Sequence, residues 1–176
     1  MLGAAGALCC LAAGTALGSW MRLRRMARLN MLRSALDMIN AMRLMLETER
    51  LSLPELLEGC ADYAGAGDGA EVIRKRFLHT ARQLRQEPLE GLFSAYAFAC
   101  AQSAVVWEQE EEKTALETLF TQLGSGTAAM REQAAAACLR RLKPVCEKAQ
   151  AEAEKGGRLC MQLGILLGLM AGIALW

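Results

Sequence analysis

Apolar residues recur at helical spacing along most of the chain. Between residues 29 and 46 they follow steps of three and four: Leu29, Leu32, Ala35, Ile39, Met42 and Leu46. This spacing predicts one apolar face of an amphipathic helix. β-Branched residues are scarce, and no alternating run is bounded by hairpin turns, so the strand signal is missing. The pattern predicts an all-α fold.

Turn signals divide the sequence into six expected helices. The first continues to about Arg50, and Ser52 opens the second because Ser52 and Glu55 have capping-box spacing. Pro54 suits a first turn, and the glycines of AGAGDG end this helix near Tyr63. Further helices are expected over about 70–85, 89–106 and 110–123, and from about 127 onward.

Two of these later helices carry additional expectations. The helix over 89–106 is strongly apolar, so we expect it to be central in the fold. Pro144 is expected to kink or break the last helix, because proline cannot donate the helical hydrogen bond. Gly156 and Gly157 offer a flexible joint further along.

Both ends of the sequence lack charge. No charged side chain occurs in residues 1–21 or 159–176, and Trp20 and Trp176 stand at the ends of these stretches. A membrane-spanning helix needs about 20 apolar residues, and tryptophan favours the interface. We expect transmembrane helices at 1–21 and 156–176, with a helical bundle at 22–155 between them. The basic residues follow the first stretch rather than precede it, which indicates a retained anchor instead of a cleaved signal.

Positive charge lies beside both predicted spans, although the net charge of the chain is only +1. The residues concerned are Arg22, Arg24, Arg25, Arg28, Lys155 and Arg158. Lys and Arg near span ends mark the cytoplasmic side. The middle domain is therefore expected in the cytoplasm, with both termini outward. The arginines lack interleaved aromatic residues, which disfavours a nucleic-acid partner.

Small residues repeat every four positions in both predicted spans. Gly14 and Gly18 form one GxxxG pair, and Gly164, Gly168 and Gly172 extend a second ladder. Such faces let helix backbones pack closely in lipid. The spans are expected to pair or to drive oligomers through them; the alternative is that glycine is simply common in membrane helices.

The sequence carries no recognisable catalytic, metal or cofactor motif. His79 is the only histidine, the seven cysteines form no CxxC, and GAGDGA follows no predicted strand. We expect no enzyme activity and no cofactor.

Two features instead suggest partner docking. One is the charged end of the first helix, with Arg43, Glu47 and Arg50, and the other is the acidic run with Glu108 and Glu111. The run Glu108, Glu110, Glu111 and Glu112 can also be read as a solvated helix start, where carboxylates favour the dipole. Five methionines, Met26, Met31, Met38, Met42 and Met45, suit either a partner surface or the core.

Three segments, LETERLSLPELLEGCA, LETLFTQLGSG and the tail from Lys155, carry a family resemblance. Together with the Arg-rich first helix, they make the whole chain resemble the stage III sporulation protein AB family of endospore-forming Firmicutes. The resemblance implies a GspF-like helical domain, similar to the platform protein of type II secretion. It also implies a membrane scaffold in the mother-cell membrane, within the channel complex that links mother cell and forespore.

The resemblance further implies a partner, the sporulation ATPase called stage III sporulation protein AA, with other membrane proteins of the channel complex and a possible homo-oligomer. Two other functions remain open from the residues: a self-contained membrane pore and a membrane enzyme acting on lipids. Against the enzyme, Asp is rare, with no DxxD. Against the pore, the spans lack ionisable residues.

Overall fold

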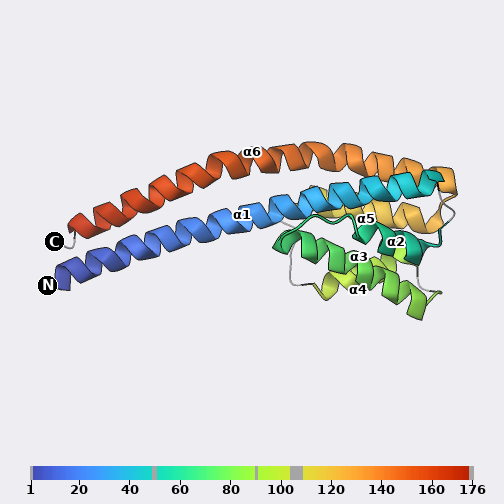
Figure 1. Cartoon of the computed structure of the whole chain (residues 1–176), viewed down its shortest axis with the longest axis horizontal. Coiled ribbons are helices and arrows are strands. Elements are labelled where there is room, and N and C mark those ends of the chain that lie inside the picture. Colours follow the sequence, from blue (N-terminus) through green and yellow to red (C-terminus); the bar gives the residue numbers. More distant parts are fainter. Residues whose placement is uncertain (1, 49–50, 90, 104–108, 175–176) are drawn as a thin grey trace. The chain divides into compact units, whose positions relative to one another are not determined.

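The computed structural model describes residues 2–48, 51–89, 91–103 and 109–174, with side chains at 13–16, 18–48, 51–89, 91–103, 109–154 and 170. In these ranges the chain forms helices and no strand, as the sequence predicts. Figure 1 labels six helices: α1 (Leu2–Thr48), α2 (Leu53–Ala61), α3 (Asp68–Gln86), α4 (Leu92–Ala101), α5 (Glu110–Ser125) and α6 (Ala128–Ala174). The all-α prediction is confirmed.

The chain forms two compact units. Residues 30–147 make a helical bundle from the second part of α1, the helices α2 to α5 and the first part of α6. Residues 1–29 and 148–176 make a separate terminal unit from the remaining parts of α1 and α6. The expected division at 1–21, 22–155 and 156–176 stays a prediction.

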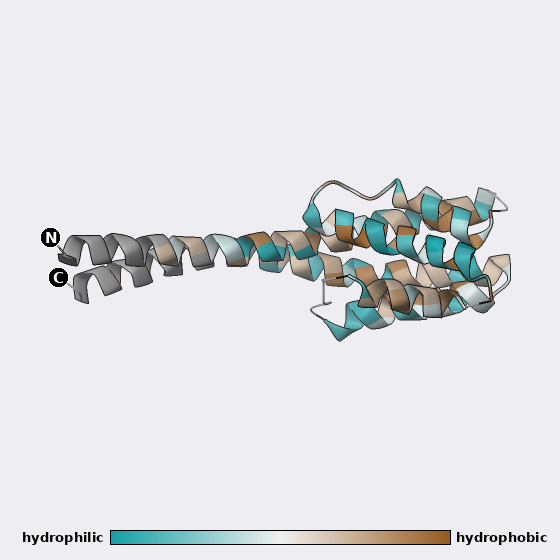
Figure 2. Ribbon diagram, turned by 90° about the horizontal axis from the view of Figure 1, so that it is seen from below, coloured by the Kyte–Doolittle hydropathy of each residue, from teal (hydrophilic) through white to brown (hydrophobic). Residues whose placement is uncertain are grey.

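The core of the bundle is aliphatic with a small aromatic centre. Met31, Met38 and Met42 of α1 are buried, so three of the five methionines from Met26 to Met45 belong to the core. Phe77 of α3 meets Phe120 of α5 edge to face, with centroids 5.4 Å apart. Figure 2 shows brown apolar and teal polar residues alternating around the helices of the bundle, which is the periodicity the sequence carries.

Local capping sets where α2 and α3 begin. The Glu55 carboxylate accepts hydrogen bonds from the backbone N–H and the hydroxyl of Ser52, at 2.9 and 2.6 Å, so the predicted capping box is present. Gly67 precedes α3 with a φ of 118°, in the left-handed region that favours glycine. A capping box thus marks the start of α2, and a glycine with positive φ marks the start of α3, the helix that carries the candidate site.

Two expectations about the later helices are wrong. The fourth helix starts at Leu92 rather than residue 89, and Phe93 and Phe98 are half-exposed, so only one face of α4 is central. Pro88 precedes Leu89, and the helix forms only after this turn region. The helix α6 continues through Pro144, and through Gly156 and Gly157, so the expected break at Pro144 is wrong. A kink at Pro144 and a flexible joint at the two glycines stay predictions. A proline removes one hydrogen bond, which the flanking turns of a 47-residue helix tolerate.

The terminal unit consists of the first part of α1 and the last part of α6. Arg28 of α1 forms an ion pair with Glu152 of α6 at 3.7 Å, and the Arg24 guanidinium lies 5.8 Å from the Trp20 ring centroid. Figures 1 and 2 both show these parts of α1 and α6 side by side. Arg22 and Arg25 are exposed. These arginines are described; their predicted role in membrane topology stays a prediction.

Among the residues that the structure describes, no helix holds a stretch both long and apolar enough to cross a membrane. The predicted spans fall largely on residues 1–12 and 155–176, whose side chains lie outside that description apart from Met170. Lys155, Arg158, Gly164, Gly168 and Gly172 belong to this undescribed set, although the backbone there is helical. Gly14 and Gly18 are partly buried and four residues apart in α1, and their packing role is untested.

Candidate functional site

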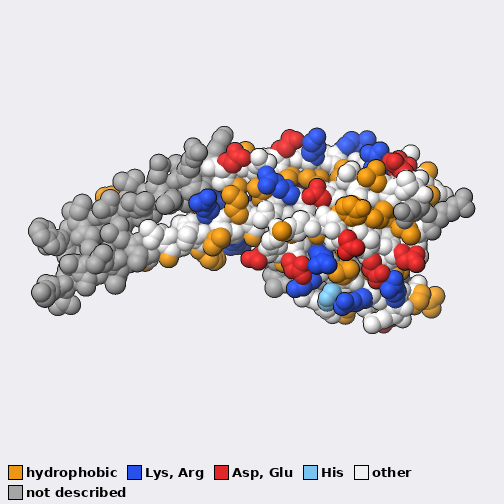
Figure 3. Space-filling view, in the orientation of Figure 1, with side chains coloured by type: hydrophobic (Ala, Val, Ile, Leu, Met, Phe, Trp, Pro, Cys, Tyr) orange, Lys and Arg blue, Asp and Glu red, His pale blue; other side chains and the backbone are white. Residues whose placement is uncertain are grey.

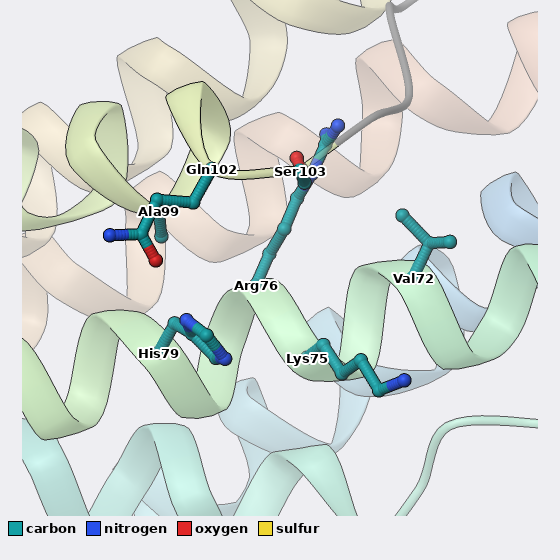
Figure 4. A pocket seen from close by; sticks show the side chains of 7 residues that line it. All are labelled: Val72, Lys75, Arg76, His79, Ala99, Gln102 and Ser103. Atoms are coloured by element: carbon teal, nitrogen blue, oxygen red, sulfur yellow. Dashed lines mark hydrogen bonds between the residues drawn. The ribbon is translucent and has the colours of Figure 1, made fainter.

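A cavity of about 240 Å³ opens between α3 and the end of α4 (Figure 4). Its lining consists of Val72, Lys75, Arg76, His79, Ala99, Gln102 and Ser103. Four of these residues come from α3 and three from the end of α4 or just beyond it. The cavity therefore combines a basic wall with a small, uncharged wall.

A buried arginine, Arg76, connects α3 with the end of α4 at the cavity. Arg76 is only 2% exposed, and its Nε donates a hydrogen bond of 2.7 Å to the Ser103 hydroxyl. The same hydroxyl donates to the Cys100 carbonyl oxygen at 3.0 Å, near the C-terminus of α4. Figure 4 shows Arg76 reaching from α3 to Ser103, with Lys75 and His79 on either side of it along α3. Arg76 thus joins α3 to the end of α4.

The outer edge of the cavity is basic. Lys75, His79 and Arg82 are exposed and follow the i, i+4, i+7 spacing of one helix face. Lys75 lies 3.6 Å from Glu71, which also pairs with Arg74 at 3.5 Å. Figure 3 shows Lys and Arg side chains over this lower part of the bundle, with acidic side chains among them. One carboxylate cannot neutralise this whole row, so the edge keeps a positive charge.

Sequence reasoning missed this site. The basic spacing in IRKRFLHTARQLR is the signal that could have indicated the row. The cavity itself depends on the approach of α3 and α4, which a single sequence does not give.

The first predicted docking patch is partly described. The Arg43 and Glu47 side chains form an i, i+4 ion pair at 3.1 Å, while Arg50 lies outside the described residues. An exposed ion pair of this kind contributes little to stability. Its role in docking stays a prediction.

The second predicted patch divides between surface and core. Glu110 and Glu111 are exposed and line a cavity of about 390 Å³ together with Arg141 of α6. Glu112 is fully buried, so the interpretation of this run as a solvated helix start is wrong at that residue. Burial follows from its position on the core face of α5, one turn before Ala115 and Leu116. Glu108 lies outside the described residues.

The bundle cysteines have the character of core residues. Burial raises the pKa of the Cys60 thiol and of the Cys138 thiol to about 12. The Cys138 thiol donates to the Ala115 carbonyl oxygen at 3.5 Å. Within the described part of the chain, no group of three or more His, Cys, Asp or Glu side chains is arranged to hold a metal ion.

The comparison with known protein families decides the identity. The sequence model of stage III sporulation protein AB matches residues 3–176, essentially the whole chain. The chain belongs to the stage III sporulation protein AB family. Membership in this family assigns it a role in stage III of sporulation, and the family is a sporulation family rather than a known enzyme family. No curated protein and no solved structure gave a significant match to the chain.

Proposed function

We propose that this member of the stage III sporulation protein AB family is a non-enzymatic membrane platform. It anchors a helical bundle at the mother-cell membrane and docks the sporulation ATPase, stage III sporulation protein AA, to the channel complex facing the forespore. The middle domain faces the cytoplasm and both termini face outward. The family match over residues 3–176 is the observation that carries this proposal.

The architecture supports a part that transmits position. The helices α1 and α6 each contain 47 residues and contribute to both the bundle and the terminal unit. In the terminal unit, the Arg28–Glu152 pair joins the two helices beside the uncharged ends of the sequence. We expect one membrane anchor at each end of the chain to restrict the tilt of the bundle more than a single anchor would.

Crosslinking in sporulating cells tests this function. The tagged full chain is crosslinked, purified from membranes and analysed by mass spectrometry. We expect the sporulation ATPase and other channel proteins, and we expect both to be lost when residues 22–155 are deleted while the two ends are kept. Recovery of the chain with lipids alone would contradict the platform and favour a self-contained pore or enzyme.

A further inference from the structure

We propose that the α3–α4 cavity and its basic edge form the docking surface for an acidic segment of a partner protein. This inference rests on the proposed function, because it names the surface through which the platform holds its partner. It places docking away from the two charged patches that the sequence suggested. The argument uses three features: the row on α3, the cavity and the exposed face of α4.

The basic row fits carboxylates spaced one helical turn apart. Lys75, His79 and Arg82 lie on one face of α3 at intervals of four and three residues. A partner helix with acidic residues at the same intervals places a carboxylate opposite each position. Lys75 has a side chain 65% exposed, so it can reach such a partner despite its contact with Glu71.

The cavity beside this row can receive a side chain of the partner and can form hydrogen bonds to it through Gln102. The side-chain amide of Gln102 can donate to a carboxylate and accept from a backbone N–H. Val72 and Ala99 supply apolar lining between the polar groups. A volume of about 240 Å³ accommodates one or two side chains rather than a whole helix. The cavity therefore suits an anchoring side chain beside the acidic row of the partner.

The exposed face of α4 extends the surface with apolar area. No charged residue occurs from Leu92 to Ser103, and the Phe98 side chain, which lies one turn before Gln102, is 50% exposed. Aromatic residues are enriched in protein interfaces, and charged residues are depleted at their centres. A partner helix with one acidic and one apolar face fits both halves of the surface. Charge complementarity favours this occupant: Lys75 and Arg82 are the charged members of the row, and they attract carboxylates.

Site-specific photocrosslinking tests the inference. A benzoylphenylalanine residue replaces Phe98 in the full chain, and crosslinked peptides from membranes of sporulating cells are sequenced. We expect an acidic segment of a protein recovered in the platform experiment. The double variant Lys75→Glu/Arg82→Glu should lower this crosslink by about tenfold, because attraction becomes repulsion at two exposed positions. Charge reversal in the identified segment should restore it.

The matched control reverses two exposed charges on α6, Arg140→Glu/Lys143→Glu. It changes the net charge equally and should leave the crosslink unchanged. The inference would be overturned if both variants lost the crosslink equally. It would also be overturned if Phe98 crosslinked to lipid, to a second copy of the chain or to a segment without acidic residues. If the wild-type chain captures no partner in either experiment, the platform itself fails. If partners are recovered but the α3 variant retains its crosslink, only this docking surface fails.

Discussion

The Tyr96 ring of α4 lies flat against the Phe120 ring of α5, with centroids 3.9 Å apart and an interplanar angle of 9°. Phe120 also receives the edge of Phe77 from α3. One aromatic side chain in α5 therefore contacts both helices that form the candidate site. This arrangement makes the geometry of the α3–α4 cavity depend on a residue outside it.

Replacing Phe120 by alanine should lower the free energy of unfolding by about 3–5 kcal/mol, since it leaves a cavity among three helices. Urea unfolding of the full chain, followed by circular dichroism, measures the change. Phe93→Ala is the control, because Phe93 is 43% exposed on α4 and its loss should cost less than about 1 kcal/mol. Similar losses in the two variants would contradict the assignment of Phe120 to the core.

Gly67→Ala should destabilise the bundle by about 1–2 kcal/mol, because an L side chain is strained at a φ of 118°. The added methyl group would also lie 3.2 Å from the Asn30 Nδ2 atom. The control is Gly91→Ala, where φ is −68° and no atom lies within 4 Å of the new group. Thermal unfolding of both variants measures the difference. An unchanged stability of the Gly67→Ala variant would contradict the positive φ at residue 67.

The sequence was sufficient to predict the helices whose signals are local. The Ser52–Glu55 box lies within one turn, and its predicted hydrogen bonds are present. The exposed half of α4 was not predictable, because ten nearly all-apolar residues have no polar face to indicate which side meets the core. The burial of Glu112 was not predictable for the same reason, and neither was the α3–α4 cavity. Both depend on how separate helices pack against one another, and the periodicity within one helix carries no information on that packing.

The Cys60 and Cys138 thiols should react slowly with iodoacetamide in the folded protein. Their pKa is raised from 9.0 to about 12 by burial, so both the thiolate fraction and the access of the reagent are low. The pKa of each buried thiol is higher in the folded protein than in the unfolded chain. The stability that these neutral thiols contribute is therefore complete below pH 9 and is lost as pH rises toward 12. Peptide mapping of alkylated protein measures the rates at pH 8. The half-buried Cys100 is the internal comparison and should react faster; labelling of Cys60 at the rate of denatured protein would contradict its burial.

The start of α2 should respond to acid through Glu55. The hydrogen bond from the Ser52 side chain, followed by the one from its backbone N–H, lowers the pKa of Glu55 below 4.5. Because the folded pKa is depressed, this stabilisation is present above the unfolded pKa of 4.5 and is lost as pH falls through the folded pKa.

Glu55→Gln should therefore remove part of the fall in stability below pH 4.5. Ser52→Ala should do the same, since it deletes the larger of the two causes. Urea midpoints measured from pH 3 to 7 report the effect, with Glu87→Gln as a control that removes an exposed carboxylate outside the box. If wild type and Glu55→Gln show the same pH profile while Glu87→Gln differs, the depressed pKa does not arise from the capping box.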